Sequence, residues 1–263
     1  MKKSSVITGL IAIASLALPL SVVAEENEEE AAPPSLTEVW IIVPKTSMEA
    51  QFAEALVADK ALRAKVGDSR SWQVYTVAFG DHLNAVQFRA NFSSWGDQDG
   101  YEVEEEEKGF GASWDENVHQ YVDHYHRHLE SIDWENSHWP EGGGDGPYYG
   151  VTTWIGKQGA GPASEAARKE ISQIALNEGW ASDENNWLWL SRETGKNMTM
   201  IVSSYGSYAD MEPPEQSIFE FLTETKGAEK AAALFSDFGS GFSDSDYTIW
   251  VHDPELSADT DEE

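Results

Sequence analysis

Residues 187–190 read Trp-Leu-Trp-Leu, four large apolar side chains in a row. Side chains alternate between the two faces of a strand, so the two tryptophans would share one face and the two leucines the other. A second run is also apolar on both faces, at Val74, Tyr75, Val77 and Phe79. Strands that are apolar on both faces need cover on both. Helices can cover one face of such a sheet, and a second sheet is the simplest cover for the other.

The first half of the chain predicts the order strand, helix, strand, strand, helix, strand. The strands are expected at 39–43, 71–79, 85–92 and 132–138. The first helix is expected to begin at the capping box Thr46-x-x-Glu49 and to end at Gly67. The second is expected to begin at the box Ser113-x-x-Glu116, because apolar residues then recur at helical spacing, at Val118, Tyr121, Val122, Tyr125 and Leu129. The acidic run at 102–107 indicates a solvated loop.

The second half repeats this order. Strands are expected at 149–155, 186–191, 198–204 and 247–251. One helix spans 163–178 and stops at Gly179. Another opens at the box Ser217-x-x-Glu220 and restarts after Gly227, running to about residue 238.

Two short motifs recur at matching places in the two halves. Ser93-Ser94-Trp95-Gly96 returns as Ser203-Ser204-Tyr205-Gly206, and His138-Trp139-Pro140-Glu141 returns as His252-Asp253-Pro254-Glu255. Both pairs fall in the same order relative to the expected elements, which indicates an internal repeat.

Each half therefore has the β-α-β-β-α-β order of a ferredoxin-like unit. An α+β chain of two such units, packed sheet to sheet, resembles the dimeric α+β barrel superfamily, here as a tandem fusion. The resemblance spans roughly residues 38–255 and rests on element order and burial pattern. It implies a barrel completed by one chain, hence a monomer, and a cavity between sheet and helices. Some members of the superfamily bind haem there or act as acid–base enzymes.

The two ends of the chain and its middle predict the domain limits. A positive start, an apolar run at 6–20 and a small residue at Ala24 indicate a signal peptide over 1–24, with an uncleaved membrane anchor as the alternative. We therefore expect an exported protein, in the periplasm or outside the cell. The remaining limits are an acidic, disordered leader at 25–37, a first repeat at 38–140, a Gly-rich linker at 141–147, a second repeat at 148–255 and an acidic tail at 256–263.

The composition excludes several classes of partner and chemistry. A net charge of −30 repels nucleic acid and anionic lipid, so neither is expected as a partner. After cleavage of the signal peptide, no stable insertion in a membrane is expected. The chain has no cysteine, which excludes disulfides, thiolate metal sites and a cysteine nucleophile. No phosphate-binding loop, dinucleotide fingerprint, nucleophile elbow or HExxH motif is present.

Four of the seven histidines lie between residues 119 and 128. On the expected helix, His124 and His128 are one turn apart, a spacing that can hold a divalent metal if a third ligand is supplied. His119 and His126 lie together on the other flank. The alternative is that these side chains are solvated or packed beside tyrosines. The resemblance adds haem as a possible cofactor, without indicating which histidine would ligate it.

The repeated histidines His138 and His252 are candidates for paired acid–base or ligand groups at equivalent barrel ends. The alternative is a turn signature, in which the proline ends a strand and the glutamate is solvated. Beyond these two candidates, the sequence identifies no catalytic residue.

Aromatic residues are the candidates for ligand contacts. Trp95 and Tyr205 occupy equivalent repeat positions beside glycine, and Trp187 and Trp189 belong to the Trp-rich strands that could stack on a flat or sugar-like ligand. Further tryptophans lie in or at the edges of expected strands, at Trp40, Trp72, Trp154 and Trp250. The alternative is that these rings only fill the barrel.

Three functions follow from these observations. The first is a module that binds a small, partly apolar or aromatic ligand. The second is a metal- or haem-assisted enzyme that uses histidines of the 119–128 segment. The third is a non-catalytic interaction protein of the cell envelope.

Overall fold

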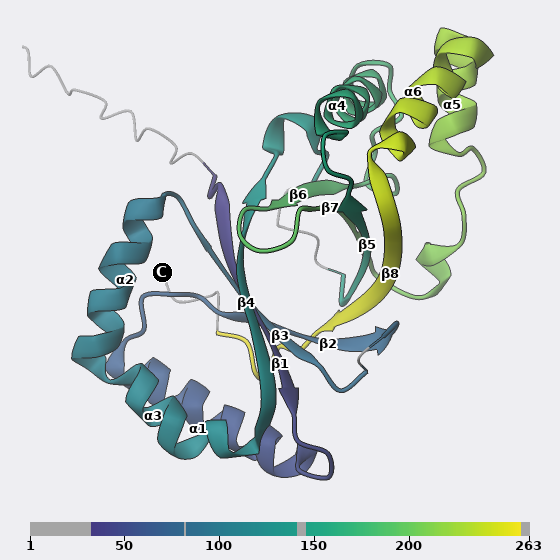
Figure 1. Ribbon diagram of the computed structural model, residues 1–263. Helices are drawn as coiled ribbons and strands as arrows, with labels where there is room; N and C mark the ends of the chain where they lie inside the picture. Colours follow the sequence, from purple (N-terminus) through teal and green to yellow (C-terminus); the bar gives the residue numbers. More distant parts are fainter. Residues whose placement is uncertain (1–32, 82, 141–145, 259–263) are drawn as a thin grey trace, which may run out of the picture. The chain divides into compact units, whose positions relative to one another are not determined.

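The computed structural model describes residues 33–81, 83–140 and 146–258. The expected signal peptide, most of the leader and of the linker, and the end of the tail lie outside these residues. Within them, eight strands close into a barrel in the order β1-β3-β2-β8-β5-β7-β6-β4 (Figure 1). Every neighbouring pair of strands is antiparallel.

The first half contains four strands and three helices in the described residues. They are β1 (Leu36–Pro44), α1 (Glu49–Val66), β2 (Gln73–Phe79), β3 (Val86–Phe92), α2 (Trp95–Lys108), α3 (Phe110–Asn117) and β4 (Val122–Ile132), with short 3-10 turns η1 (His119–Tyr121) and η2 (Trp134–Asn136). The second half contains β5 (Tyr148–Gly156), α4 (Gly161–Asn177), β6 (Leu188–Arg192), β7 (Met198–Tyr205), η3 (Ala209–Met211), α5 (Ile218–Lys226), α6 (Ala228–Ser240) and β8 (Phe242–His252).

The strand order confirms the tandem α+β barrel. The four strands of the first half run β4-β1-β3-β2, and those of the second run β8-β5-β7-β6. The halves meet at two seams, where Tyr75 of β2 pairs with His252 of β8 and Ser131 of β4 pairs with Ser191 of β6. Each half alone would leave two strand edges with unpaired backbone groups, and closure pairs them.

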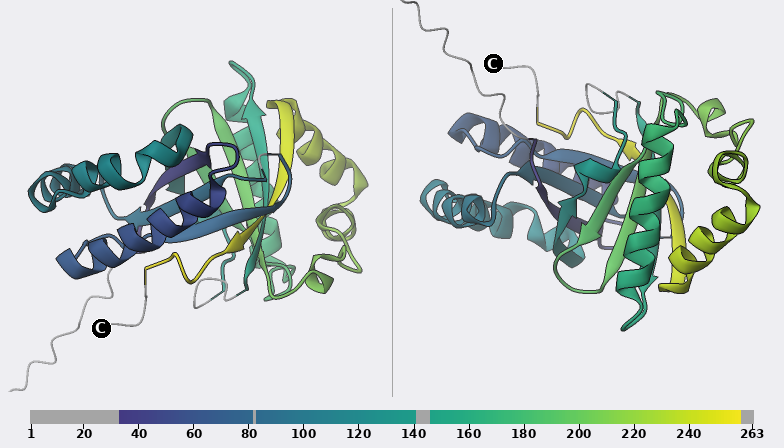
Figure 2. Two further views of the ribbon diagram at one scale, coloured as in Figure 1. Left: turned by 90° about the horizontal axis from the view of Figure 1, so that it is seen from below. Right: turned by 90° about the horizontal axis from the view of Figure 1, so that it is seen from above.

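The helices lie outside the barrel. Figures 1 and 2 show α1 to α3 beside the strands of the first half and α4 to α6 beside those of the second. Each strand therefore has one face toward the barrel interior and one toward helices, as the apolar runs predicted. In the part of the chain that the structure describes, no helix combines the length and the hydropathy needed to cross a bilayer.

The prediction of a helix through residues 118–129 is wrong. Helix α3 ends at Asn117, and the following residues form β4, which pairs with β1 from Leu36↔Ser131 to Pro44↔Val122. Valine, tyrosine and histidine are weak helix formers, and the edge of β1 gives them a full ladder of backbone hydrogen bonds. Apolar residues spaced by three and four satisfied the helical pattern by coincidence.

Two neighbouring predictions also need correction. The acidic run at 102–107 is part of α2, which begins at a capping box formed by Ser94 and Asp97. The helix expected to begin at Ser113 is α3, which already begins at Phe110, so Ser113 does not cap it. The strand expected at 132–138 is reduced to the turn η2 and an isolated bridge between His138 and Trp187.

The end of the chain is ordered further than the expected tail allows. The Ala258 amide donates to the Trp72 carbonyl at 2.8 Å, and the Val74 amide donates to the Ser257 hydroxyl at 2.9 Å. Ser257 is buried. The segment after β8 therefore packs along β2 and ties the end of the second half to the first.

Candidate ligand-binding cavity

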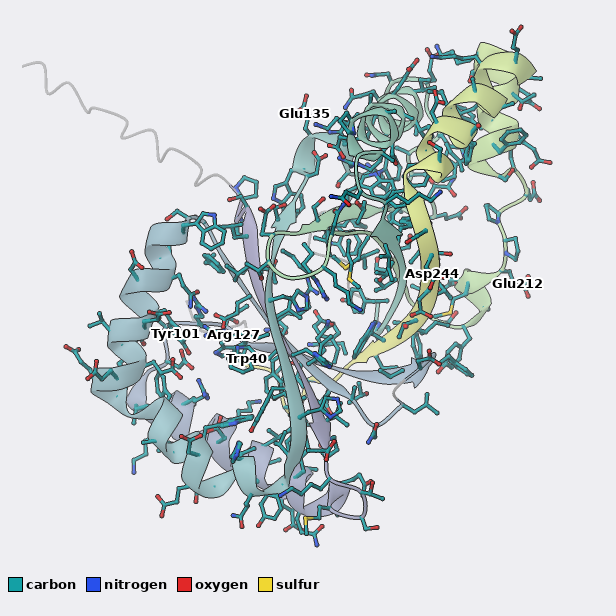
Figure 3. All side chains as sticks on the ribbon, in the orientation of Figure 1. Trp40, Tyr101, Arg127, Glu135, Glu212 and Asp244 are labelled. Carbon is teal, nitrogen blue, oxygen red and sulfur yellow. The ribbon has the colours of Figure 1, made fainter. Side chains whose placement is uncertain are left out.

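A cavity of about 660 Å³ lies between the helices and the sheet of the first half. Its volume is within the range of sites that hold small organic molecules. Strands β1, β3 and β4 form its floor, and α1, α2 and α3 form its walls. Leu256 and Ala258, from the segment after β8, also line it. Figure 3 shows three lining residues, Trp40, Tyr101 and Arg127, in the space between α2 and the sheet.

The lining is rich in aromatic rings, which are Trp40, Trp72, Phe88, Tyr101 and Trp114. Their polar atoms are already bonded within the protein. The Trp114 indole donates to the Tyr125 hydroxyl at 3.0 Å, and the Trp72 indole donates to the Tyr101 hydroxyl at 3.3 Å. The rings therefore offer the cavity mainly carbon surface, which favours an apolar or flat ligand.

A buried carboxylate, Glu38 of β1, organises the charged part of the floor. It is 1% exposed, and it accepts from Arg127 at 2.6 Å and from the Trp40 indole at 2.8 Å through one oxygen. Its other oxygen accepts from Arg70. The Arg70 guanidinium lies over the Tyr101 ring, 3.9 Å from the ring centroid. Glu38 is thus paired on both sides, as a buried charge must be.

A second charged group joins α1 to the loop that follows it. Arg63 donates to Asp59 at 2.6 Å and to Asp68 at 2.9 Å. The Tyr101 hydroxyl donates to Asp68 at 3.2 Å. Burial, with the nearby Asp68 carboxylate, raises the pKa of Tyr101 to about 12. The hydroxyl therefore stays neutral at physiological pH and serves as a hydrogen-bond donor.

The four aromatic residues proposed from the sequence do not line this cavity. Trp95, at the start of α2, is 54% exposed. Tyr205 lies at the end of β7 on the second half. Trp187 and Trp189 are buried beneath α4, where the Trp189 indole donates to Ser172. Two other tryptophans do line the cavity, Trp40 of β1 and Trp72 just before β2.

The proposed metal pair rested on a helix that is not formed. His124 and His128 lie on β4, where residues four apart are separated by about 13 Å at 3.3 Å per residue. His128 is buried and contacts Glu130 at 2.8 Å and Arg192 at 3.2 Å. His124 contacts Asp123 at 2.8 Å. The described residues contain no group of three or more His, Asp or Glu side chains placed to hold a metal ion.

The other two histidines of the segment also lie outside the cavity lining. His119 contacts the Tyr125 hydroxyl at 2.9 Å, and its ring stacks on that tyrosine. The His126 ring packs against His124 with 5.3 Å between centroids.

His138 and His252 occupy different surroundings. His138 bridges to Trp187 through the backbone and packs against its ring. His252 lies at the seam with β2, where its Nε2 contacts Ser257 at 2.9 Å and Gln73 at 3.0 Å. Burial lowers the pKa of His252. Within the described residues no contact joins the two histidines, so the structure gives no paired acid–base site.

No pattern in the sequence indicates the ionic cluster that lies inside the barrel. Glu130 of β4 accepts from Arg89 of β3 at 2.6 Å and contacts His128, which in turn contacts Arg192 of β6. Burial alone would raise the pKa of Glu130, but Arg89 and His128 outweigh it and hold the pKa at about 2. The cluster spans the seam between the halves and serves to join them.

No protein-family model and no curated protein matches this sequence. Solved structures do match. A variant of chlorite dismutase from Candidatus Nitrospira defluvii is 9% identical, with 85% of this chain and 94% of that chain covered and a TM-score of 0.53. A provisionally assigned monooxygenase from Fusobacterium nucleatum subsp. nucleatum is 9% identical, with 83% and 92% covered and a TM-score of 0.50. At this identity the likeness shows the fold, the dimeric α+β barrel, and no activity.

The residues of the cavity do not fit a haem. Haem iron is held by histidine, cysteine, methionine or tyrosinate. Among the described residues that line the cavity there is no histidine or methionine, and Tyr101 keeps its proton and is bonded to Asp68. Between the sheet and the helices of the second half, the space is packed with Trp154, Trp189 and Phe238.

Proposed function

We propose that this protein binds a small, partly aromatic molecule in the cavity between α1, α2, α3 and the sheet of its first half. The observation that carries the proposal is the aromatic lining of a cavity of about 660 Å³. Covering apolar surface stabilises a complex by about 25 cal/mol per Å² before the cost of immobilising the ligand is subtracted. Flat rings that stack or pack edge to face on indole gain somewhat more.

The polar groups of the cavity support binding to a preformed site. Glu38, Arg70 and Arg63 are held by ion pairs and by aromatic rings, so little side-chain ordering remains to be done when a ligand enters. The site is therefore expected to bind without a large change in the fold.

The proposal can be tested by filling the cavity. Ala61 and Ala64 are both exposed on α1, but only Ala64 lines the cavity, at its rim. Binding of 2-naphthoate, 2-naphthamide, indole-3-acetate and indole-3-acetamide is measured by titration calorimetry. We expect at least one compound to bind the unchanged protein and Ala61→Trp, and to lose binding in Ala64→Trp.

Failure of all four compounds to bind the unchanged protein would contradict the proposal. Equal binding to Ala64→Trp and Ala61→Trp would place the site elsewhere and also contradict it. Circular dichroism of both variants shows whether the tryptophans leave the fold intact.

We further propose that the protein is exported, to the periplasm or beyond, and acts as a monomer. The signal-peptide pattern of residues 1–24 supports export. A barrel closed by one chain supports a monomer. Mass spectrometry of the protein from its own host should find an N-terminus at Glu25, and light scattering should find the mass of one chain. An intact N-terminus or a dimer mass would refute the respective proposal.

A further inference from the structure

The charges on the cavity floor do not cancel. Glu38 is one negative charge held between two positive ones, Arg70 and Arg127. The three ions therefore carry a net charge of about +1, in a part of the protein where burial reduces screening by water. The Glu105 and Asp97 carboxylates act on Arg70 through their charge, so a negative group on a ligand would be held best at Arg127.

Arg127 is the member of this trio that a ligand can reach. Its side chain is 43% exposed, whereas the side chains of Arg70 and Glu38 are 5% and 1% exposed. Its Nε is bonded to Glu38, and neither of its Nη groups has a hydrogen-bond partner among the described residues. Its guanidinium lies over the Trp40 ring, 4.9 Å from the centroid, which fixes its plane beside an aromatic wall.

We infer that the molecule bound in this cavity is an aromatic carboxylate, and that Arg127 binds its carboxylate group. The two free Nη groups supply a pair of charge-assisted donors, while the neighbouring rings hold the aromatic part. Glu38 acts as a positioning residue, because its bond to Nε orients the guanidinium. This inference rests on the proposed function and adds the chemical class of the ligand.

The remaining charges of the lining favour this end of the cavity for an anion. Asp59 and Asp68 are paired with Arg63, and Lys60 donates to the Glu255 carbonyl. The other two carboxylates that line the cavity are Glu105 of α2 and Asp115 of α3. Within the described residues, neither side chain forms a hydrogen bond or an ion pair. These carboxylates repel an anion from the helical wall, so a bound carboxylate is directed to the floor.

Matched acids and amides test the inference separately from the proposed function. The acids 2-naphthoate and indole-3-acetate differ from their amides in charge and hardly in shape. For the unchanged protein we expect at least one acid to bind about tenfold more tightly than its amide, which corresponds to about 1.4 kcal/mol. In Arg127→Gln this ratio should fall close to one, while the affinity for the amide is kept.

Two further variants complete the test. Arg127→Lys keeps the charge but loses the planar pair of donors, so its acid-to-amide ratio should lie below that of the unchanged protein. Lys196→Gln removes an exposed cation that does not line the cavity, and its ratio should not change.

The outcomes are distinguishable. If acids and amides bind the unchanged protein equally, or if Arg127→Gln keeps the preference for acids, the inference is overturned and the proposed function stands. If no compound binds, the proposed function fails with it. Retained amide binding shows that Arg127→Gln is folded; if it is not, the acid-to-amide ratio of Arg127→Lys still tests the role of Arg127.

Discussion

The Ser257 hydroxyl accepts a hydrogen bond from the Val74 amide at 2.9 Å, although the two residues are 183 positions apart. Both are buried. Ser257→Ala would leave a buried amide without a partner, which costs about 1–3 kcal/mol. We expect the free energy of unfolding, measured by urea denaturation, to fall by that amount.

Ser240→Ala is the matched control for this prediction. Its hydroxyl is exposed and donates to the Asp237 carbonyl, so its loss should change stability by less than about 0.5 kcal/mol. Equal effects of the two substitutions would show that the segment after β8 does not help to hold the fold.

The ionic cluster of the barrel predicts a loss of stability in acid. The pKa of Glu130 is lowered from 4.5 to about 2 in the folded protein, so the folded state binds fewer protons than the unfolded state between these values. The stabilisation is present above pH 4.5 and is lost as pH falls toward 2, by about 3 kcal/mol in all. Urea denaturation at a series of pH values measures it.

Glu130→Gln should remove this acid-dependent part. It should also destabilise the protein at pH 7 by about 3–5 kcal/mol, because Arg89 and His128 lose their buried counter-charge. Glu135→Gln, at an exposed position labelled in Figure 3, is the control and should leave both quantities unchanged. A full acid dependence in Glu130→Gln would refute the assignment.

His252 predicts a second pH dependence, nearer to neutrality. Because burial lowers its pKa in the folded state, the folded protein binds fewer protons here than the unfolded chain, whose ordinary value is 6.5. The contribution is complete above pH 6.5 and decreases as pH falls below it. The difference in stability between the unchanged protein and His252→Gln should therefore narrow from pH 7.5 to pH 5.5. A constant difference would mean that His252 titrates alike in both states.

The unpaired carboxylates of the cavity wall predict a gain of affinity. The double substitution Glu105→Gln and Asp115→Asn removes two negative charges that repel the carboxylate of 2-naphthoate. Binding of 2-naphthoate should therefore strengthen roughly threefold at low salt. Binding of 2-naphthamide should not change. Added salt should reduce the gain, and a gain that is the same for acid and amide would exclude an electrostatic cause.

Most of the fold could be predicted because its signals are local. The box at Ser217 does cap α5, where the Glu220 amide donates to the Ser217 hydroxyl, and the apolar strands do lie between two layers. The closure of two such halves into a barrel follows from their free edges. The segment after Asn117 cannot be predicted in this way, because its spacing of apolar residues suits a helix while its partner strand β1 is far away in the sequence.

The cavity could not be predicted, because tryptophans of similar sequence context have different surroundings. Trp40 and Trp189 both alternate with apolar residues on a strand. Trp40 borders a cavity, while Trp189 packs on Trp154 and Phe238. Whether such a tryptophan lines a cavity or fills a core depends on how closely the covering helices approach the sheet, which is a property of the whole half. The one sequence feature that points to this cavity is a charged residue at a strand position that faces the helices, such as Glu38.

The single-chain barrel has a consequence for how its two sides can change. When two identical chains form such a barrel, every substitution appears twice, so a tryptophan that plugs one side plugs the other as well. Here the two halves are encoded separately, and they differ: Trp189 lies in a closely packed aromatic cluster, whereas Trp40 lines the cavity. One side can hold the molecule together while the other is free to adapt to a ligand, a division of labour that a symmetric pair cannot reach.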